Sequence, residues 1–198
     1  MKKLDHKQLS TTKGIKVKGP LLIEPKIFRD ERGFFFESWN QKDWEEILKN
    51  YNQIPQNFCQ DNHSKSCRGV LRGLHFQKDP FPQAKLVRCI FGEIYDVAVD
   101  IRKNSITYGE WVGTYLSSAN NHQLWIPEGF AHGFLTISEY AEVNYKTTNY
   151  WNKNYEESLL WNDRDISINW PLESLKNETL KISDKDKNAK TFKSFKTR

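Results

Sequence analysis

The chain has 198 residues, with 30 basic residues against 25 acidic ones and a formal net charge of +5. Five of the basic residues and no acidic residue lie in residues 187–198, so residues 1–186 carry no net charge. The excess positive charge therefore lies at the chain ends. Because chain ends are usually solvated tails, this charge does not indicate a nucleic-acid-binding surface. No apolar run reaches the ~20 residues of a membrane span, and residues 1–13 lack the apolar segment of a signal peptide.

The length fits one domain. We expect an N-terminal extension in residues 1–13, a single domain in residues 14–186 and a basic C-terminal tail in residues 187–198. The three cysteines form no CxxC motif and no even framework. Free thiols are typical of a reducing compartment, so the sequence predicts a cytoplasmic protein.

The first predicted strands cover residues 21–24 and 33–39. Asn40 can then cap a helix over residues 41–51, whose apolar residues, Trp44 among them, share one face. This amphipathic pattern indicates a helix that packs on a sheet.

Seven strand-like runs follow, separated by turn residues. They cover residues 70–76, 85–91, 94–101, 111–117, 124–126, 133–137 and 142–148. Gly92-Glu93 lies between two of these runs and predicts a two-residue hairpin. Many short strands with one early helix predict an all-β fold, a jelly-roll barrel or sandwich with a small C-terminal helical or loop segment.

Some polar residues fall on strand faces that should be apolar. Strict alternation places Lys85, His132 and Tyr145 on the same faces as their apolar neighbours at i±2. A barrel lined by these side chains is a binding cavity rather than a fully packed core.

Arg72-Gly73-Leu74-His75 places a guanidinium three residues before an imidazole. Strict alternation would direct the two side chains to opposite faces, but a bulge at Gly73 could re-aim one of them. A histidine in a strand is more often structural, although titration near neutral pH makes His75 a candidate for acid-base chemistry.

Residues 127–132 have the PxGxxH spacing of the second motif of cupin proteins. In metal-binding cupins this histidine, here His132, is a ligand together with a paired HxH motif. Here the pair would be His75 and Gln77, so one histidine is missing. Two histidines without a nearby carboxylate are a poor metal site, and the sequence predicts no metal and no cofactor.

Two polar segments have more than one interpretation. Residues 60–64, Gln-Asp-Asn-His-Ser, form either a surface loop or a binding segment. Arg32, in a charged turn before an aromatic strand, is either a solvated turn residue or a phosphate clamp. The sequence has no GxGxxG or GxxxxGK[ST] motif, so dinucleotide and ATP binding have no motif support.

Taken together, several ordered motifs carry a resemblance that runs from about Gly14 to Lys187. They lie in residues 24–37, 60–64, 69–77, 83–88, 125–134, 145–148, 161–163 and 182–186. With these motifs the sequence resembles the dTDP-4-dehydrorhamnose 3,5-epimerases, a family of cupin-type sugar-nucleotide enzymes.

The resemblance implies a cupin-type jelly-roll homodimer that uses no metal. The implied substrate is dTDP-4-dehydro-6-deoxy-D-glucose, which is inverted at C3 and C5 to dTDP-4-dehydro-L-rhamnose. His75 matches the family's base, Asp186 its carboxylate partner, Tyr145 the acid and Lys85 the cation beside the C4 oxygen. The other positions that match substrate-binding residues are Arg32, Glu37, Gln60, Asp61, Asn62, Arg72, His132, Trp151 (stacked on thymine), Glu156 and Lys185.

The chemistry agrees with this set of residue types. C3 and C5 both flank the C4 ketone, so their protons are acidic enough for an enolate route. Inversion requires a base on one face of the sugar and a proton donor on the other, roles that suit a neutral His and a Tyr with its ordinary pKa near ~10. A lysine beside the oxyanion stabilises the charge that develops there.

Several alternatives remain open at this point. Asp184 competes with Asp186 as the partner of His75, and Asp96 could pair with His132, although we expect Asp96 on the outside of its strand. A C3-only or C5-only epimerase, a 3,4-ketoisomerase, a metal-dependent cupin and a non-catalytic sugar-nucleotide binding module are the competing functions.

Overall fold

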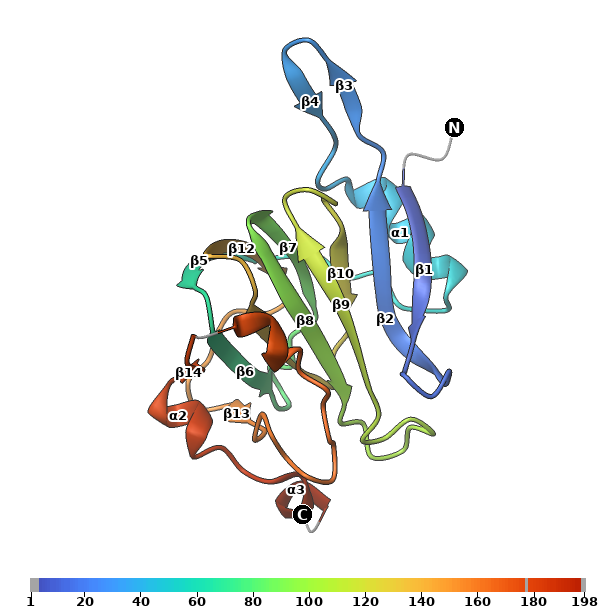
Figure 1. Ribbon diagram of the computed structural model, residues 1–198. Coiled ribbons are helices and arrows are strands. Elements are labelled where there is room, and N and C mark those ends of the chain that lie inside the picture. The colour runs from blue at the N-terminus through green and yellow to red at the C-terminus, as the bar shows by residue number, and fades with distance from the viewer. Residues whose placement is uncertain (1–3, 177, 197–198) are drawn as a thin grey trace.

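The computed structural model describes residues 4–176 and 178–196. Two six-stranded β-sheets face each other, and every strand pair within them is antiparallel except that of β14 with β6 (Figure 1). The first sheet has the order β1 (Leu4–Ser10), β2 (Lys16–Pro25), β10 (Gln123–Ile126), β7 (Lys85–Phe91), β12 (Tyr140–Thr147) and β5 (Gln60–Cys67). The second has β13 (Glu156–Ser158), β6 (Val70–Gln77), β11 (Phe130–Thr136), β8 (Glu93–Asp100) and β9 (Trp111–Ser117), with β14 (Lys181–Ile182) beside β6.

The remaining elements are short. The hairpin of β3 (Phe28–Asp30) and β4 (Gly33–Phe35) projects from the body as a separate two-stranded sheet (Figure 1). The helices are α1 (Gln41–Asn50), the 3-10 turn Leu172–Leu175, α2 (Asp184–Lys187) and α3 (Phe192–Lys196). The all-β, cupin-type sandwich with one early helix and a short helical C-terminal segment is confirmed.

The core lies between the two sheets because alternate residues of each strand point inward. Val87 and Val143 from the first sheet meet Ala98 and Phe134 from the second in one buried cluster. The expected polar residues share these inward faces: Lys85 and His132 are each 7% exposed.

Helix α1 covers the outer face of the first sheet. The Asn40 side chain accepts hydrogen bonds from the backbone N–H groups of Lys42 and Asp43, which is the predicted N-cap. The apolar face of the helix, including Trp44, packs against Leu86 and Trp125 of the sheet. This packing leaves the opposite, inward face of the sheet to form the cavity.

Two predictions of local structure are wrong. Gly92 is not the turn of a hairpin, because β7 pairs with β10 and β12 while β8 pairs with β9 and β11. The chain instead crosses from one sheet to the other at this glycine. The strand expected over residues 33–39 is only β4, which ends at Phe35.

Both chain ends are part of the fold where the structure describes them. Strand β1 pairs with β2 along most of its length, and Phe192, in the supposed C-terminal tail, is only 2% exposed. The expectation of solvated ends is therefore wrong for these residues, while the exact domain boundaries stay a prediction. Among the described residues, no helix has the length and apolar character needed to cross a membrane.

Candidate active site

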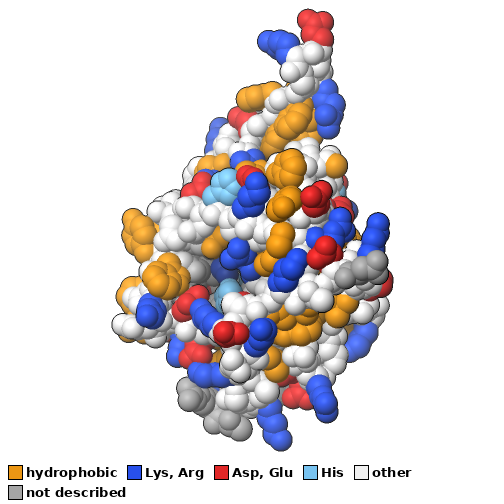
Figure 2. Space-filling view, turned by 60° about the vertical axis from the view of Figure 1, so that its left-hand side comes forward, with side chains coloured by type: hydrophobic (Ala, Val, Ile, Leu, Met, Phe, Trp, Pro, Cys, Tyr) orange, Lys and Arg blue, Asp and Glu red, His pale blue; other side chains and the backbone are white. Residues whose placement is uncertain are grey.

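A cavity of about 310 Å³ opens between β5, β6, β7 and β12. It is lined by seven of the residues singled out by the sequence: Gln60, Asn62, His75, Lys85, Tyr145, Trp151 and Glu156. Figure 2 shows basic and acidic side chains gathered around a recess, in which a histidine is visible. Inward-facing Lys85 and Tyr145 thus belong to one polar site rather than being isolated buried groups.

His75 is paired with a buried carboxylate. Its Nε2 lies 2.6 Å from Oδ1 of Asp186, a residue that is 3% exposed. Asp184, the competing candidate, is almost fully exposed and lies 3.5 Å from the Lys187 ammonium. The structure therefore brings Asp186, and not Asp184, to His75.

The Asp186 carboxylate is held ionised by its hydrogen bonds. Burial would raise its pKa, but the contacts from His75 and from the backbone N–H of Gly73, at 3.3 Å to Oδ2, lower it below the ordinary value. Ser183 caps the one-turn helix α2 by accepting from the Asp186 N–H at 3.2 Å. An ionised Asp186 can orient His75 and stabilise its imidazolium form.

A bulge in β6 brings Arg72 to the same side of the sheet as His75. Against β11, His75 pairs with His132 and Arg72 with Phe134, so β6 has one extra residue between these positions. Gly73 has a φ of +125°, and a Cβ there would lie 2.5 Å from the Gly133 Cα. Only a pair of glycines allows this close approach, and the bulge predicted at Gly73 is confirmed.

Lys85 lies at the floor of the cavity. Burial lowers its pKa to about 8, against the opposing charges of Asp96 and Glu156. Its Nζ donates a hydrogen bond to the His75 carbonyl oxygen at 3.3 Å. Burial also raises the pKa of Tyr145, with Arg72 opposing, so the phenol is protonated at neutral pH. The cavity thus contains a cation and a phenolic proton donor near His75.

His132 belongs to a second His–Asp pair. Its Nε2 lies 2.9 Å from Oδ1 of Asp96, which is fully buried on β8. Burial lowers the pKa of His132, and Lys85 and His75 act in the same direction while Asp96 opposes them. The expectation that Asp96 points outward is wrong, and alternation with buried Ile94 and Ala98 is the signal that would have placed it inside.

Residues 60–67 form the edge strand β5 rather than a loop. Because side chains alternate along a strand, the predicted binding residues of β5 lie on two opposite faces of the sheet. Gln60 and Asn62 line the cavity and are joined by a hydrogen bond of 2.8 Å. Gln60 also accepts from the Trp151 N–H at 3.0 Å. Asp61 points to the opposite face, where it lies 3.0 Å from the Lys146 ammonium.

The cavity rim carries charged and aromatic groups. Trp151 is 54% exposed, which leaves its ring available for stacking. Lys185 forms an ion pair with Glu156. Arg72 donates from Nε to the Ser66 hydroxyl at 3.0 Å and has an exposed guanidinium. These groups could bind the nucleotide and diphosphate of a sugar nucleotide.

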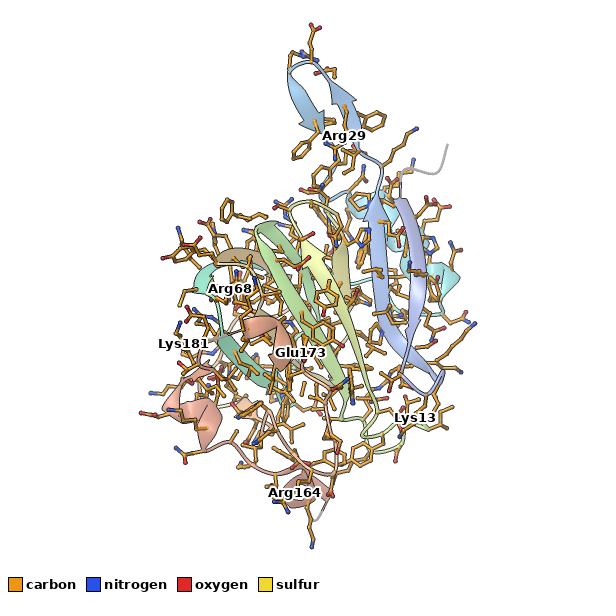
Figure 3. The ribbon with its side chains drawn as sticks, viewed as in Figure 1. Lys13, Arg29, Arg68, Arg164, Glu173 and Lys181 are labelled. Atoms are coloured by element: carbon orange, nitrogen blue, oxygen red, sulfur yellow. The ribbon has the colours of Figure 1, made fainter. Side chains whose placement is uncertain are left out.

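The structure does not bring Arg32 and Glu37 to this cavity. Arg32 lies on the turn of the β3–β4 hairpin, where it pairs with Asp30 at 2.6 Å. Glu37 lies near the base of the hairpin, 3.5 Å from the Asn40 side-chain amide. Figure 3 labels Arg29 on this hairpin, which extends away from the two sheets. Within one chain these two residues are therefore separate from the site.

The sequence matches a known family along most of its length. Residues 14–194 match the family model described as dTDP-4-dehydrorhamnose 3,5-epimerase. The epimerase of Salmonella typhimurium is 60% identical over 155 residues, which cover 78% of this chain and 82% of that protein.

Solved structures agree with this match. The epimerase of Legionella pneumophila, in complex with dTDP-4-keto-L-rhamnose, has a TM-score of 0.83 at 45% identity and covers 94% of this chain and 93% of its own. A 3'-monoepimerase of Streptomyces bikiniensis, in complex with dTDP-quinovose, has a TM-score of 0.81 at 28% identity over 90% of this chain and 86% of its own. With a matching family model, close relatives and a shared fold, the chain belongs to the dTDP-4-dehydrorhamnose 3,5-epimerase family.

Proposed function

We propose that this isomerase inverts C3 and C5 of dTDP-4-dehydro-6-deoxy-D-glucose and forms dTDP-4-dehydro-L-rhamnose, with His75 as the base and Tyr145 as the acid. The observation that carries this proposal is the short contact between His75 and buried Asp186, in the same cavity as Tyr145 and Lys85. A base supported by a carboxylate and a protonated phenol are the two proton-transfer groups that inversion requires.

Each inversion is a balanced proton exchange. Because neutral His75 donates its Nε2–H to ionised Asp186, its Nδ1 lone pair accepts the proton from the carbon next to the C4 ketone, and the C–H electron pair forms the enolate. The Lys85 ammonium stabilises the negative charge on O4. Tyr145 then donates its phenolic proton to the opposite face of the same carbon. Before the second carbon reacts, His75 loses its extra proton to solvent and the Tyr145 phenolate takes up a proton from solvent.

The rim of the cavity supports binding of the dTDP portion. Trp151 has an exposed aromatic face for thymine. Arg72 and Lys185 supply positive charge for the diphosphate, and Gln60 and Asn62 supply amide groups. His132 is neutral and held by Asp96, and Lys85 and His75 are near enough for their charges to lower its pKa, so we assign it to the sugar end of the site.

We further propose a homodimer in which the β3–β4 hairpin of one subunit reaches the cavity of its partner. Arg32 and Glu37 match substrate-binding positions but lie away from the cavity of their own chain. Phe28, Phe34 and Phe35 on the hairpin are all exposed, which suits a surface that a second copy covers. The three cysteines are free, as expected for the cytoplasm, where we place the enzyme.

Two alternatives have less support. A single-centre epimerase is the first alternative, since a 3'-monoepimerase shares this fold. However, the 60% identity to a 3,5-epimerase favours inversion at both carbons. For a metal-dependent cupin the donor set is poor: among residues 4–176 and 178–196, no three His, Cys, Asp or Glu side chains cluster as ligands.

Conversion of dTDP-4-dehydro-6-deoxy-D-glucose, followed by NMR, tests the proposal. We expect wild-type protein to convert the substrate and His75→Ala to lose turnover by about 10³-fold or more while it still binds dTDP. A His75→Ala variant as active as wild type would contradict the assignment of the base. A wild-type protein that binds dTDP but converts no substrate would support the binding module instead.

A further inference from the structure

Residues 189–195 follow α2 and have no role in the site described above. The segment is nevertheless anchored by one side chain, since Phe192 is 2% exposed within the buried cluster of the second sheet. We propose that this segment, the C-terminal clamp, positions the Asp186 carboxylate against His75, with Phe192 as its main positioning residue. The inference rests on the proposed function of the His75–Asp186 pair.

The first anchor of the clamp is the strand next to His75. The Lys190 carbonyl oxygen accepts from the Leu160 N–H at 2.8 Å, and Lys190 N–H donates to the Ser158 carbonyl oxygen at 3.3 Å. Strand β13 pairs Ser158 directly with His75. Leu159 and Leu74 also exchange backbone hydrogen bonds of 2.9 and 3.1 Å. The clamp is thus hydrogen-bonded to Ser158 and Leu160, which flank Leu159, and this segment pairs in turn with Leu74 and His75.

The second anchor is a pair of phenylalanines. The Phe192 N–H donates to Oδ2 of buried Asp163 at 2.9 Å, and the Phe192 ring lies 4.9 Å from the Tyr108 ring. The Phe195 ring meets the edge of Phe76 with ring centroids 5.6 Å apart. Phe76 lines the cavity and follows His75 in the chain. Through this aromatic contact, the clamp packs against a residue that lines the cavity.

Helix α2 needs such anchors because it is too short to be stable alone. It has four residues, which is about one turn, and a single turn gains too few hydrogen bonds to offset its nucleation cost. On one side β14 fixes the chain beside Val70 and Leu71 of β6 (Figure 1). On the other side the clamp fixes Lys190, four residues after Asp186. Both anchors set where the carboxylate lies.

Phe192→Ala tests the clamp, because it removes the buried ring without changing the identity of any residue that lines the cavity. We expect kcat to fall about 10- to 100-fold, since small displacements of catalytic groups have effects of this size. KM and the affinity for dTDP should change less than about twofold, because the rim of the cavity is untouched. The proton NMR resonance of His75 Nε2–H, assigned by its absence in His75→Ala, should broaden or disappear with the loss of its partner.

Three variants complete the experiment. Phe192→Leu restores an apolar side chain and should recover most of kcat. Lys193→Ala, at an exposed position of the same helix, should match wild type. Phe195→Ala removes the contact with Phe76 but keeps Phe192. We expect a smaller fall in kcat for this variant, and it replaces Phe192→Ala in the test if Phe192→Ala does not fold.

Two results would overturn the proposal. One is wild-type kcat and an unchanged His75 resonance in a folded Phe192→Ala or Phe195→Ala protein. The other is a parallel loss of kcat, dTDP affinity and thermal stability, which would indicate a general structural role. The NMR resonance and dTDP binding can be read without turnover, so failure of the proposed reaction in wild-type protein is distinguishable from failure of the clamp.

Discussion

At the scale of single residues, burial adjusts the charge state of the groups that handle protons. Lys85 is buried and its pKa falls to about 8, whereas the pKa of the Tyr145 phenol rises. Near neutral pH one group is therefore a cation and the other a proton donor. These are the forms that an enolate mechanism requires, one to stabilise O4 and one to reprotonate carbon.

The lowered pKa of Lys85 predicts a loss of activity in alkaline solution. As the pH rises through about 8, the ammonium loses its proton and no longer stabilises the enolate oxygen. We expect kcat to decline above this pH, measured with saturating substrate. Lys85→Met should be about 100-fold slower or worse at neutral pH and should lack this decline. A wild-type kcat that stays level well above this pH would contradict the role of Lys85.

The sequence predicted most of the residues in the cavity and named both carboxylates, but it left the two His–Asp pairs open to alternatives. Strand alternation indicated that Lys85, His132 and Tyr145 face inward, because period-two patterns are local. The choice between Asp186 and Asp184 required the three-dimensional placement of α2, and only Asp186 is buried. Asp96 was expected on the outside because a carboxylate on an inward face is rare, although its pairing with His132 was the alternative that the structure shows.

At the scale of elements, the bulge in β6 is the feature that assembles the site. It breaks the alternation between Arg72 and His75, so that both side chains lie on the same side of the sheet. Gly73 and Gly133 make it possible by letting two backbones approach closely. A regular strand would direct one of the two side chains away from the substrate.

Gly73→Ala should therefore be more damaging than replacement of a glycine elsewhere that has a similar φ. Gly33 is a matched control, since its φ is +130° and a Cβ there would meet no atom within 4 Å. We expect Gly73→Ala to lower the free energy of unfolding by about 2 kcal/mol more than Gly33→Ala, because it adds a backbone overlap to the same strain. Chemical denaturation measures both. Equal losses would show that the close approach does not restrict this position.

The error at Gly92 and the open choice at residues 60–64 have a common cause. Locally, Gly92 looks like the turn of a hairpin, and residues 60–64 look like either a loop or a binding segment. What decides their structure is the pairing of distant segments: β7 with β10 and β12, and β5 with β12. Helix α1 was predicted nearly residue for residue because its cap and its apolar face lie within one short segment.

At the scale of the whole molecule, the net charge of +5 is a weak guide to function. The excess lies at the ends, yet the described parts of both ends are structural: β1 extends a sheet and Phe192 is buried. The charges that matter for the proposed reaction are a few groups, including Arg72, Lys85 and Lys185, around one cavity.

The proposed dimer predicts complementation between two damaged subunits. Arg32→Ala should raise KM about tenfold, the usual effect of losing a hydrogen bond to a charged group, with kcat little changed. A mixed dimer of Arg32→Ala and His75→Ala subunits contains one complete site, formed by an intact His75 cavity and the partner's Arg32. We expect the mixture, measured at low substrate concentration, to be more active than the sum of the separate variants. Additive activities would place Arg32 outside the partner's site.

The central claim is that one cavity exchanges protons at two carbons of the same sugar. Incubation of the wild-type enzyme with dTDP-4-dehydro-6-deoxy-D-glucose in deuterated water, followed by NMR, tests it most directly. The account predicts deuterium at both C3 and C5 of the product and none at either carbon with His75→Ala. Deuterium at only one carbon would identify a single-centre epimerase, and no deuterium at either carbon would contradict the mechanism.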